Sequence, residues 1–221
     1  MHFHLPKPLH GWRAFAGEVG IIVIGVLIAL AAEQVVQGVH ERDDMVQLRT
    51  ALRSELADAR ARWENIRAQD RCTEQRLDAL DKWVATAPPN ATLRRAYLPF
   101  LWNMHSSAWD LAKTSPAASH IPLKDRLNYA SLYAGLDNWR LFINEEDQNI
   151  GVVSALFATA DQPENRRQLR FHLVQARFML HRRQRNYDYF FTRFDDLGIK
   201  PDTSQLTVQF DPQTLCGPLE S

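Results

Sequence analysis

Residues 52–84 read LRSELADARARWENIRAQDRCTEQRLDALDKWV, and this stretch decides the fold class. Ten positions along it alternate in steps of four and three residues, and all but two are apolar: Leu52, Leu56, Ala59, Trp63, Ile66, Asp70, Thr73, Leu77, Leu80 and Val84. This heptad spacing places the whole series on one face of an α-helix. Between Val35 and Val84 the chain has no Pro and only one Gly. The spacing therefore predicts one long amphipathic helix, which the pair Pro88-Pro89 ends.

A second repeat of the same kind predicts a last helix from about Asn165 to Leu197. Its positions are Leu169, Leu173, Ala176, Leu180, Arg183, Tyr187, Phe190, Phe194 and Leu197. Gly198 and Pro201 follow it as a helix stop. Between the two repeats, the stretch from Leu123 to about Ala160 reads as another long helix, and shorter helices are expected at 91–103, 106–113 and 116–120.

The predicted fold class is all-α, with an N-terminal transmembrane helix that runs into the long amphipathic helix, an antiparallel helical bundle and a short polar C-terminal tail. The apolar stripes must meet, because packing supplies most of the stability of a helix in water. The expected divisions are a cytoplasmic segment at 1–14, the transmembrane helix at 15–36, the bundle at 37–198 and the tail at 199–221. In the tail, alternating apolar residues predict a short strand or an extended strap: Leu206, Val208 and Phe210.

The segment from Val19 to Ala32 holds no polar side chain, and counting from Phe15 to Val36 gives 22 residues. A helix of that length rises about 33 Å, and the hydrocarbon core of a bilayer is about 30 Å thick. We interpret the segment as an uncleaved membrane anchor. Two alternatives stay open: a signal peptide that is cleaved at Ala29-Leu30-Ala31, and a buried core helix.

Flanking charge suggests an orientation for this anchor. Residues 1–18 hold two basic and one acidic residue, whereas residues 33–50 hold two basic and four acidic residues. The positive-inside tendency then places the N-terminus in the cytoplasm and the main domain on the other side, which is the periplasm in a bacterial inner membrane.

One stripe of the anchor combines small and acidic residues at helical spacing: Glu18, Gly25, Ala29 and Glu33. Gly25 and Ala29 form a small-xxx-small pair, which lets two helix backbones approach closely. A packing contact with a second copy or with a partner membrane protein would fit this stripe. The interpretation that we favour is a generic anchor in contact with the lipid bilayer alone, because small-xxx-small pairs are common in apolar segments.

Charge and cysteine usage restrict the function classes. Lys plus Arg equals Asp plus Glu, at 26 each, so the global charge does not favour a nucleic-acid partner. Cys72 and Cys216 are the two cysteines. They could form one disulfide in an oxidising compartment, which would strap the tail onto the domain, or remain two thiols.

The last helix is strongly basic, with eight Arg against three Asp between Arg166 and Asp196. An anionic-lipid face or a nucleic-acid face would fit this pattern. The interpretation that we favour is a solvated face that also pairs with acids of the first helix, such as Glu55, Glu64 or Glu74.

No nucleotide-binding, hydrolase, metalloprotease or CxxC motif occurs in the chain, and we expect no catalytic residues, cofactor or metal ion. The N-terminal histidines match no defined metal site: His2, His4 and His10. An unrecognised active site would most plausibly draw on four residues near the proline-punctuated region: Trp102, His105, Trp109 and His120.

The stretch 9–30, LHGWRAFAGEVGIIVIGVLIAL, resembles the start of a family of bacterial single-pass, membrane-anchored helical proteins that has no established activity. Residues 109–112 and 126–133 also resemble segments of that family. The resemblance implies an anchor followed by a helical domain, and it implies no functional residues.

Three functions fit these observations. The first, which we favour, is a membrane-anchored extracytoplasmic scaffold or protein-interaction module that is not an enzyme. The second is a ligand-sensing helical bundle that signals through a partner. The third is an enzyme with an unrecognised site.

Overall fold

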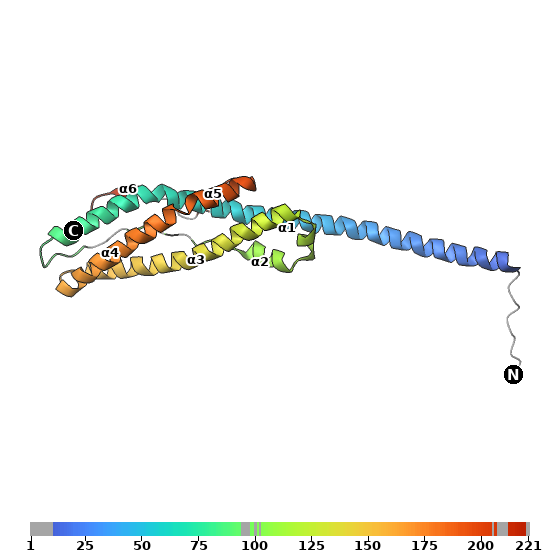
Figure 1. Cartoon of the computed structure of the whole chain (residues 1–221), viewed down its shortest axis with the longest axis horizontal. Helices are drawn as coiled ribbons and strands as arrows, with labels where there is room; N and C mark the ends of the chain where they lie inside the picture. Colours follow the sequence, from blue (N-terminus) through green and yellow to red (C-terminus); the bar gives the residue numbers. More distant parts are fainter. Residues whose placement is uncertain are drawn as a thin grey trace, which may run out of the picture. The chain divides into compact units, whose positions relative to one another are not determined.

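The structure is a computed structural model, which describes residues 11–93, 98–99, 101, 103–204, 206 and 212–219. Throughout these residues the regular elements are helices, and none of them forms a β-strand. Figure 1 shows the elements in chain order: α1 (Gly11–Thr86), α2 (Ser107–Thr114), the 3₁₀ helix η1 (Pro116–His120), α3 (Leu123–Ala158), α4 (Pro163–Gln184), α5 (Tyr187–Asp196) and α6 (Pro212–Cys216). The all-helical fold class is therefore confirmed.

The chain divides into two compact units, Met1–Gln47 and Leu48–Ser221. The first unit contains the N-terminal part of α1. One helix among the described residues is long and apolar enough to cross a membrane by length and composition, and its most apolar window has a mean hydropathy of 2.5. None of that window is buried inside the protein. A buried core helix, one of the three interpretations of this segment, therefore does not describe it.

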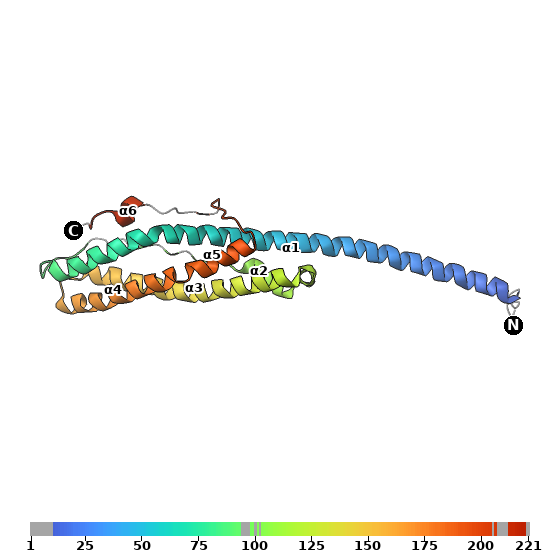
Figure 2. The ribbon, with the colours of Figure 1, turned by 45° about the horizontal axis from the view of Figure 1, so that its top comes forward.

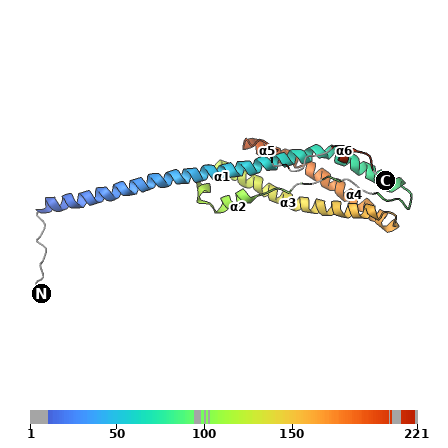
Figure 3. The same ribbon diagram turned by 180° about the vertical axis from the view of Figure 1, so that it is seen from behind.

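In the second unit, α1 from Leu48 onward lies beside α3 and α4 (Figures 2 and 3). All ten positions of the first heptad repeat are buried. The second repeat is buried from Leu169 to Phe194, and only its last member, Leu197, is partly exposed. Both repeats thus predicted the core-facing side of their helices. Full burial of one such leucine side chain contributes about 1.5–3 kcal/mol of transfer free energy.

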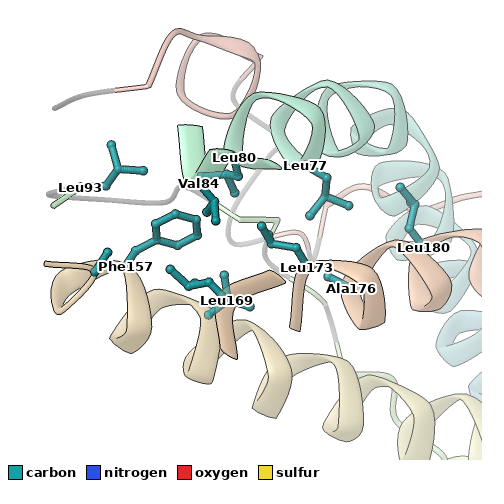
Figure 4. Close-up of a cluster of buried hydrophobic side chains, with 11 residues drawn as sticks. Leu77, Leu80, Val84, Leu93, Phe157, Leu169, Leu173, Ala176 and Leu180 are labelled. Carbon is teal, nitrogen blue, oxygen red and sulfur yellow. The ribbon is translucent and has the colours of Figure 1, made fainter. Parts of the chain in front are cut away.

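One core cluster lies where α1 ends and where the chain turns from α3 to α4 (Figure 4). Each of the three helices contributes to it, as does the loop after α1: Leu77, Leu80, Val84, Leu93, Val153, Phe157, Ala160, Leu169, Leu173, Ala176 and Leu180. Arg166 closes this end of the unit, because its guanidinium donates to the carbonyl oxygens of Ala87, Pro88, Ala91 and Ala160.

A second cluster is aromatic and centres on Trp63 of α1. Its ring centroid lies 4.2 Å from that of Trp139 in α3, and 4.3 Å and 5.5 Å from those of Phe190 and Tyr187 in α5. Edge-to-face and offset aromatic pairs at such distances add stability beyond their buried area. The cluster joins α5 to the two long helices.

The prediction of one unbroken last helix was wrong. The structure ends α4 at Gln184 and begins α5 at Tyr187, with Arg185 and Asn186 in a turn. Neither residue is a helix breaker, so the cause is tertiary: the turn sets the direction in which Tyr187 and Phe190 reach the cluster around Trp63.

The helix expected at 91–103 was also wrong, since its described residues are not helical. Pro99 lies within it and lacks the N–H that a helix interior needs. The helices expected at 106–113, 116–120 and 123–160 are confirmed as α2, η1 and α3. In the tail, Leu206 is not in a strand, and Val208 and Phe210 lie outside the described residues.

Candidate functional site

The C-terminal tail is fixed to α1 at two adjacent points. Cys72 and Cys216, 144 residues apart, are joined in a disulfide with their Cα atoms 4.8 Å apart. One turn further along α1, Arg76 is buried and donates to the carbonyl oxygens of Thr214, Leu215 and Gly217, each at 2.9 Å. The segment 212–219 is therefore held by one covalent bond and one guanidinium.

Two more arginines of α1 hold the start of the tail. Arg53 donates to the carbonyl oxygens of Leu197 and Gly198 at 2.8 and 2.9 Å, and Arg60 donates to that of Ile199 at 2.7 Å. Gly198 has a φ of +60°, in the left-handed region, and ends α5 as its sequence position indicated.

A buried charge network links α1, α3 and α4. Arg183 has no exposed surface and donates to Asp70 at 2.7 Å and to Glu146 at 2.6 Å. The hydroxyl of Tyr187 donates to the other oxygen of Asp70 at 2.6 Å. Asp70 and Arg183 are the charged members of the two apolar repeats, so the two interruptions of the sequence pattern meet in space.

Burial governs the protonation of this network. It raises the pKa of the Glu146 carboxyl, although the charge of Arg183 opposes the shift. Burial likewise raises the pKa of Tyr187, which keeps its hydroxyl protonated as the donor to Asp70. Because its members are buried, the network meets no solute, and its role is to position α1, α3, α4 and α5.

The face of α4 opposite the core is apolar. Phe171, Val174 and Phe178 are 68%, 66% and 58% exposed, and they follow one another at steps of three and four residues. Arg167 and Arg185 continue the same line beyond the two ends, and Arg170 and His181 lie beside it, all exposed. We call these three apolar residues and their basic neighbours the α4 outer face.

Sequence reasoning missed this face, because only the buried repeat and the charges of the last helix were considered. The signal was present: Phe171, Val174 and Phe178 fall at helical spacing, out of phase with the buried repeat that contains Leu169 and Leu173.

Basic side chains of α4 pair with acidic side chains of α1, as expected, but mostly with acids other than the predicted ones. Arg177 contacts Asp78 and Asp81 of α1 at 2.8 and 3.2 Å. Of the acids expected to pair with this helix, Glu74 lies 3.8 Å from His181. Glu64 pairs instead with Arg60 of its own helix, and Glu55 accepts a hydrogen bond from the backbone N–H of Ala108.

A cavity of about 460 Å³ lies between α3 and the region where α4 meets α5. Aromatic rings, two asparagines and one arginine line it, and it opens to solvent. No small-molecule site had been predicted from its lining residues, and Arg182 had been considered only as part of the basic face of the last helix.

Of the residues proposed for an unrecognised active site, none that the structure describes lines the cavity. His105 and His120 are exposed, and Trp109 stacks on Tyr133 with ring centroids 5.2 Å apart. Trp102 and the three N-terminal histidines lie outside the described residues. Within the part of the chain that the structure describes, no three His, Cys, Asp or Glu side chains gather as metal ligands would.

The stripe proposed for packing of the anchor is exposed along its whole length, at Glu18, Gly25, Ala29 and Glu33. A Cβ atom built on Gly25 would meet nothing within 4 Å. Its surface is therefore open to a lipid or a partner helix, and no other described part of the protein covers it.

The geometry defines an all-helical protein with one helix that could cross a membrane, and with an exposed apolar face and a cavity in its second unit. In comparisons with known proteins, no family model, curated protein or solved structure matches the chain.

Proposed function

We propose that the protein is a membrane-anchored scaffold whose second unit, an antiparallel helical bundle, binds a partner protein through the α4 outer face. The observation that carries the proposal is the exposure of Phe171, Val174 and Phe178 on the side of α4 that faces away from the core. A helix on the surface of a soluble domain is normally polar on that side. Adjacent exposed large apolar residues mark an interaction surface more often than an ordinary surface.

The basic residues around this face specify the chemistry of the partner. Arg170 and Arg185 are exposed and make no ion pair within the described residues, whereas Arg167 is paired with Glu164 at 3.0 Å. An apolar stripe bordered by free guanidinium groups complements an apolar surface bordered by Asp and Glu. The partner is therefore a protein segment with that pattern, such as an acidic amphipathic helix.

The membrane anchor and its orientation belong to the same proposal. The apolar segment of α1 is exposed and of spanning length, and its flanking charges favour a cytoplasmic N-terminus. The pairing of Cys72 with Cys216 supports an oxidising compartment for the second unit, which is the periplasm if the chain is anchored in a bacterial inner membrane.

Site-specific photocrosslinking in native membranes tests the proposed contact. A benzophenone amino acid at position 174 should give one discrete crosslinked product of the full chain, and the charge reversals Arg170→Glu and Arg185→Glu together should remove it. The matched control carries the same probe at position 141, because Leu141 of α3 is as exposed as Val174 but has no such basic border. The same products from both positions, or no product from position 174, would overturn the proposal.

The cavity favours ligand sensing as a second function, and its chemistry is developed below. The described residues give no observation that favours the third function, an enzyme.

A further inference from the structure

The cavity between α3 and the α4–α5 turn combines flat apolar walls with a small number of polar groups. Its volume of about 460 Å³ is in the range of small-molecule sites, which is about 300–1,000 Å³. Four of its lining residues are aromatic: Trp139, Phe142, Tyr189 and Phe190. Such walls accept the faces of a planar ring better than a flexible chain, since aromatic rings stack at defined distances.

The aromatic walls are held rigidly from behind. Trp139 and Phe190 both pack against Trp63, which is fully buried. A Cβ atom at Gly135 would lie 2.9 Å from the Phe190 ring, so only glycine lets that ring lie this close to α3. A wall that is already packed costs little ordering entropy when a ligand binds.

Among the described residues that line the cavity, Arg182 is the one charged residue and none is acidic. The guanidinium carbon of Arg182 lies 5.0 Å from the ring centroid of Phe142, and the side chain makes no ion pair within the described residues. Its donors thus remain available to an anion, in the planar fork that matches a carboxylate.

Two amide groups supply further polar contacts, one from α3 and one from the turn between α4 and α5. Asn138 and Asn186 both line the cavity, and each amide can donate to an oxygen atom. The amide of Asn186 already donates one hydrogen bond, to the carbonyl oxygen of Arg182 at 2.8 Å. At the opposite polar end, the hydroxyls of Ser131 and Tyr189 already contact each other at 3.1 Å.

We propose that this cavity binds a small aromatic carboxylate. The ring of the ligand lies among Trp139, Phe142 and Phe190, and its carboxylate pairs with Arg182. This site is separate from the α4 outer face and does not depend on the proposed protein partner.

The test measures binding of 2-naphthoate to the full chain in lipid nanodiscs by equilibrium dialysis, with uptake by empty nanodiscs subtracted. The uncharged isostere 2-naphthamide isolates the contribution of the carboxylate. Arg182→Gln removes the guanidinium, and Ala134→Phe narrows the cavity, which Ala134 lines from an exposed position. Arg71→Gln is the matched control, because Arg71 of α1 is exposed, does not line the cavity and lies outside the α4 outer face.

We expect saturable binding of 2-naphthoate that Arg182→Gln weakens about tenfold or more, the loss expected for one charge-assisted contact. Ala134→Phe should also weaken it, Arg71→Gln should leave it within about twofold, and 2-naphthamide should bind about tenfold more weakly. Binding should persist when Phe171, Val174 and Phe178 are all replaced by Ser, which separates this site from the protein-binding face. The absence of saturable binding, or equal binding of the acid and the amide, would overturn the proposal.

Discussion

The guanidinium of Arg183 in α4 lies 2.7 Å from the carboxylate of Asp70 in α1, at a depth where Arg183 has no exposed surface. Burying two charges costs several kcal/mol each, so the pair does little for net stability compared with an apolar pair of the same shape. Its effect is on register, because any sliding of α4 along α1 would separate Arg183 from Asp70 and leave the Asp70 carboxylate buried without its guanidinium partner. The hydroxyl of Tyr187 and the carboxylate of Glu146 tie α5 and α3 to the same point.

Removing one charge of this pair should be costly. Asp70→Asn keeps the shape of the side chain but leaves Arg183 with one anionic partner fewer, and we expect the free energy of unfolding to fall by about 3–5 kcal/mol. Urea unfolding of the full chain in detergent, followed by circular dichroism, measures the change. Asp78→Asn is the control, because Asp78 pairs with Arg177 at the surface and such pairs contribute about 1 kcal/mol or less. Equal losses for the two variants would contradict the assigned role of Asp70.

Glu146 should make stability depend on pH. Its folded pKa is raised by burial, whereas the same carboxyl in the unfolded chain titrates at about 4.3. Between these two values the folded state binds more protons, so the contribution of Glu146 is complete below the unfolded pKa and is lost as pH rises through the folded pKa. Glu146→Gln does not titrate.

The free energy of unfolding of the wild type, minus that of Glu146→Gln, should therefore decrease as pH rises above about 4.3 and through the raised folded pKa of Glu146. Urea titrations of both chains at a series of pH values give this difference directly. A difference that grows with pH would mean that Arg183 outweighs burial and lowers the pKa of Glu146.

Reduction should destabilise the second unit. The disulfide between Cys72 and Cys216 closes a long loop, and opening it should lower the free energy of unfolding by about 2–4 kcal/mol. Unfolding of the full chain with and without a phosphine reductant measures the effect. Cys216→Ser should resemble the reduced wild type and should not respond to the reductant. If the reductant lowered the free energy of unfolding of Cys216→Ser, the effect would not come from this disulfide.

Arg76→Lys should loosen the end of the tail without affecting the helices. Lysine carries one ammonium group in place of the fork with which Arg76 reaches Thr214, Leu215 and Gly217. Amide hydrogen exchange of residues 214–217 should accelerate about tenfold or more, as expected for the loss of hydrogen bonds to a charged donor. Arg71→Lys, at an exposed position of the same helix, should leave that exchange unchanged. If exchange of residues 214–217 were also unchanged in Arg76→Lys, the disulfide and not Arg76 would hold this end of the tail.

The buried sides of the helices that carry the two heptad repeats could be predicted from the sequence, because heptad spacing identifies the side of a helix that faces the core. Even the polar members Asp70 and Arg183 stood out as exceptions within their repeats. What could not be read was the break between Gln184 and Tyr187, since it arises from the packing of α5 on residues far away in the chain.

The candidate sites were less accessible to sequence reasoning. The cavity is built by residues from three helices, and no short motif records that Arg182 lies beside Phe142. The apolar residues of the α4 outer face have helical spacing in the sequence, but the many arginines of the same helix led to an interpretation by charge.

The bridge between Cys72 and Cys216 also makes the second unit a covalently closed ring for most of its length. A protease that cuts once inside that ring, for example between α1 and α2, produces two fragments that remain joined. The C-terminal fragment stays covalently attached to α1, the helix that bears the apolar segment, until the disulfide is reduced. A nicked molecule would run as one species on a non-reducing gel and as two after reduction.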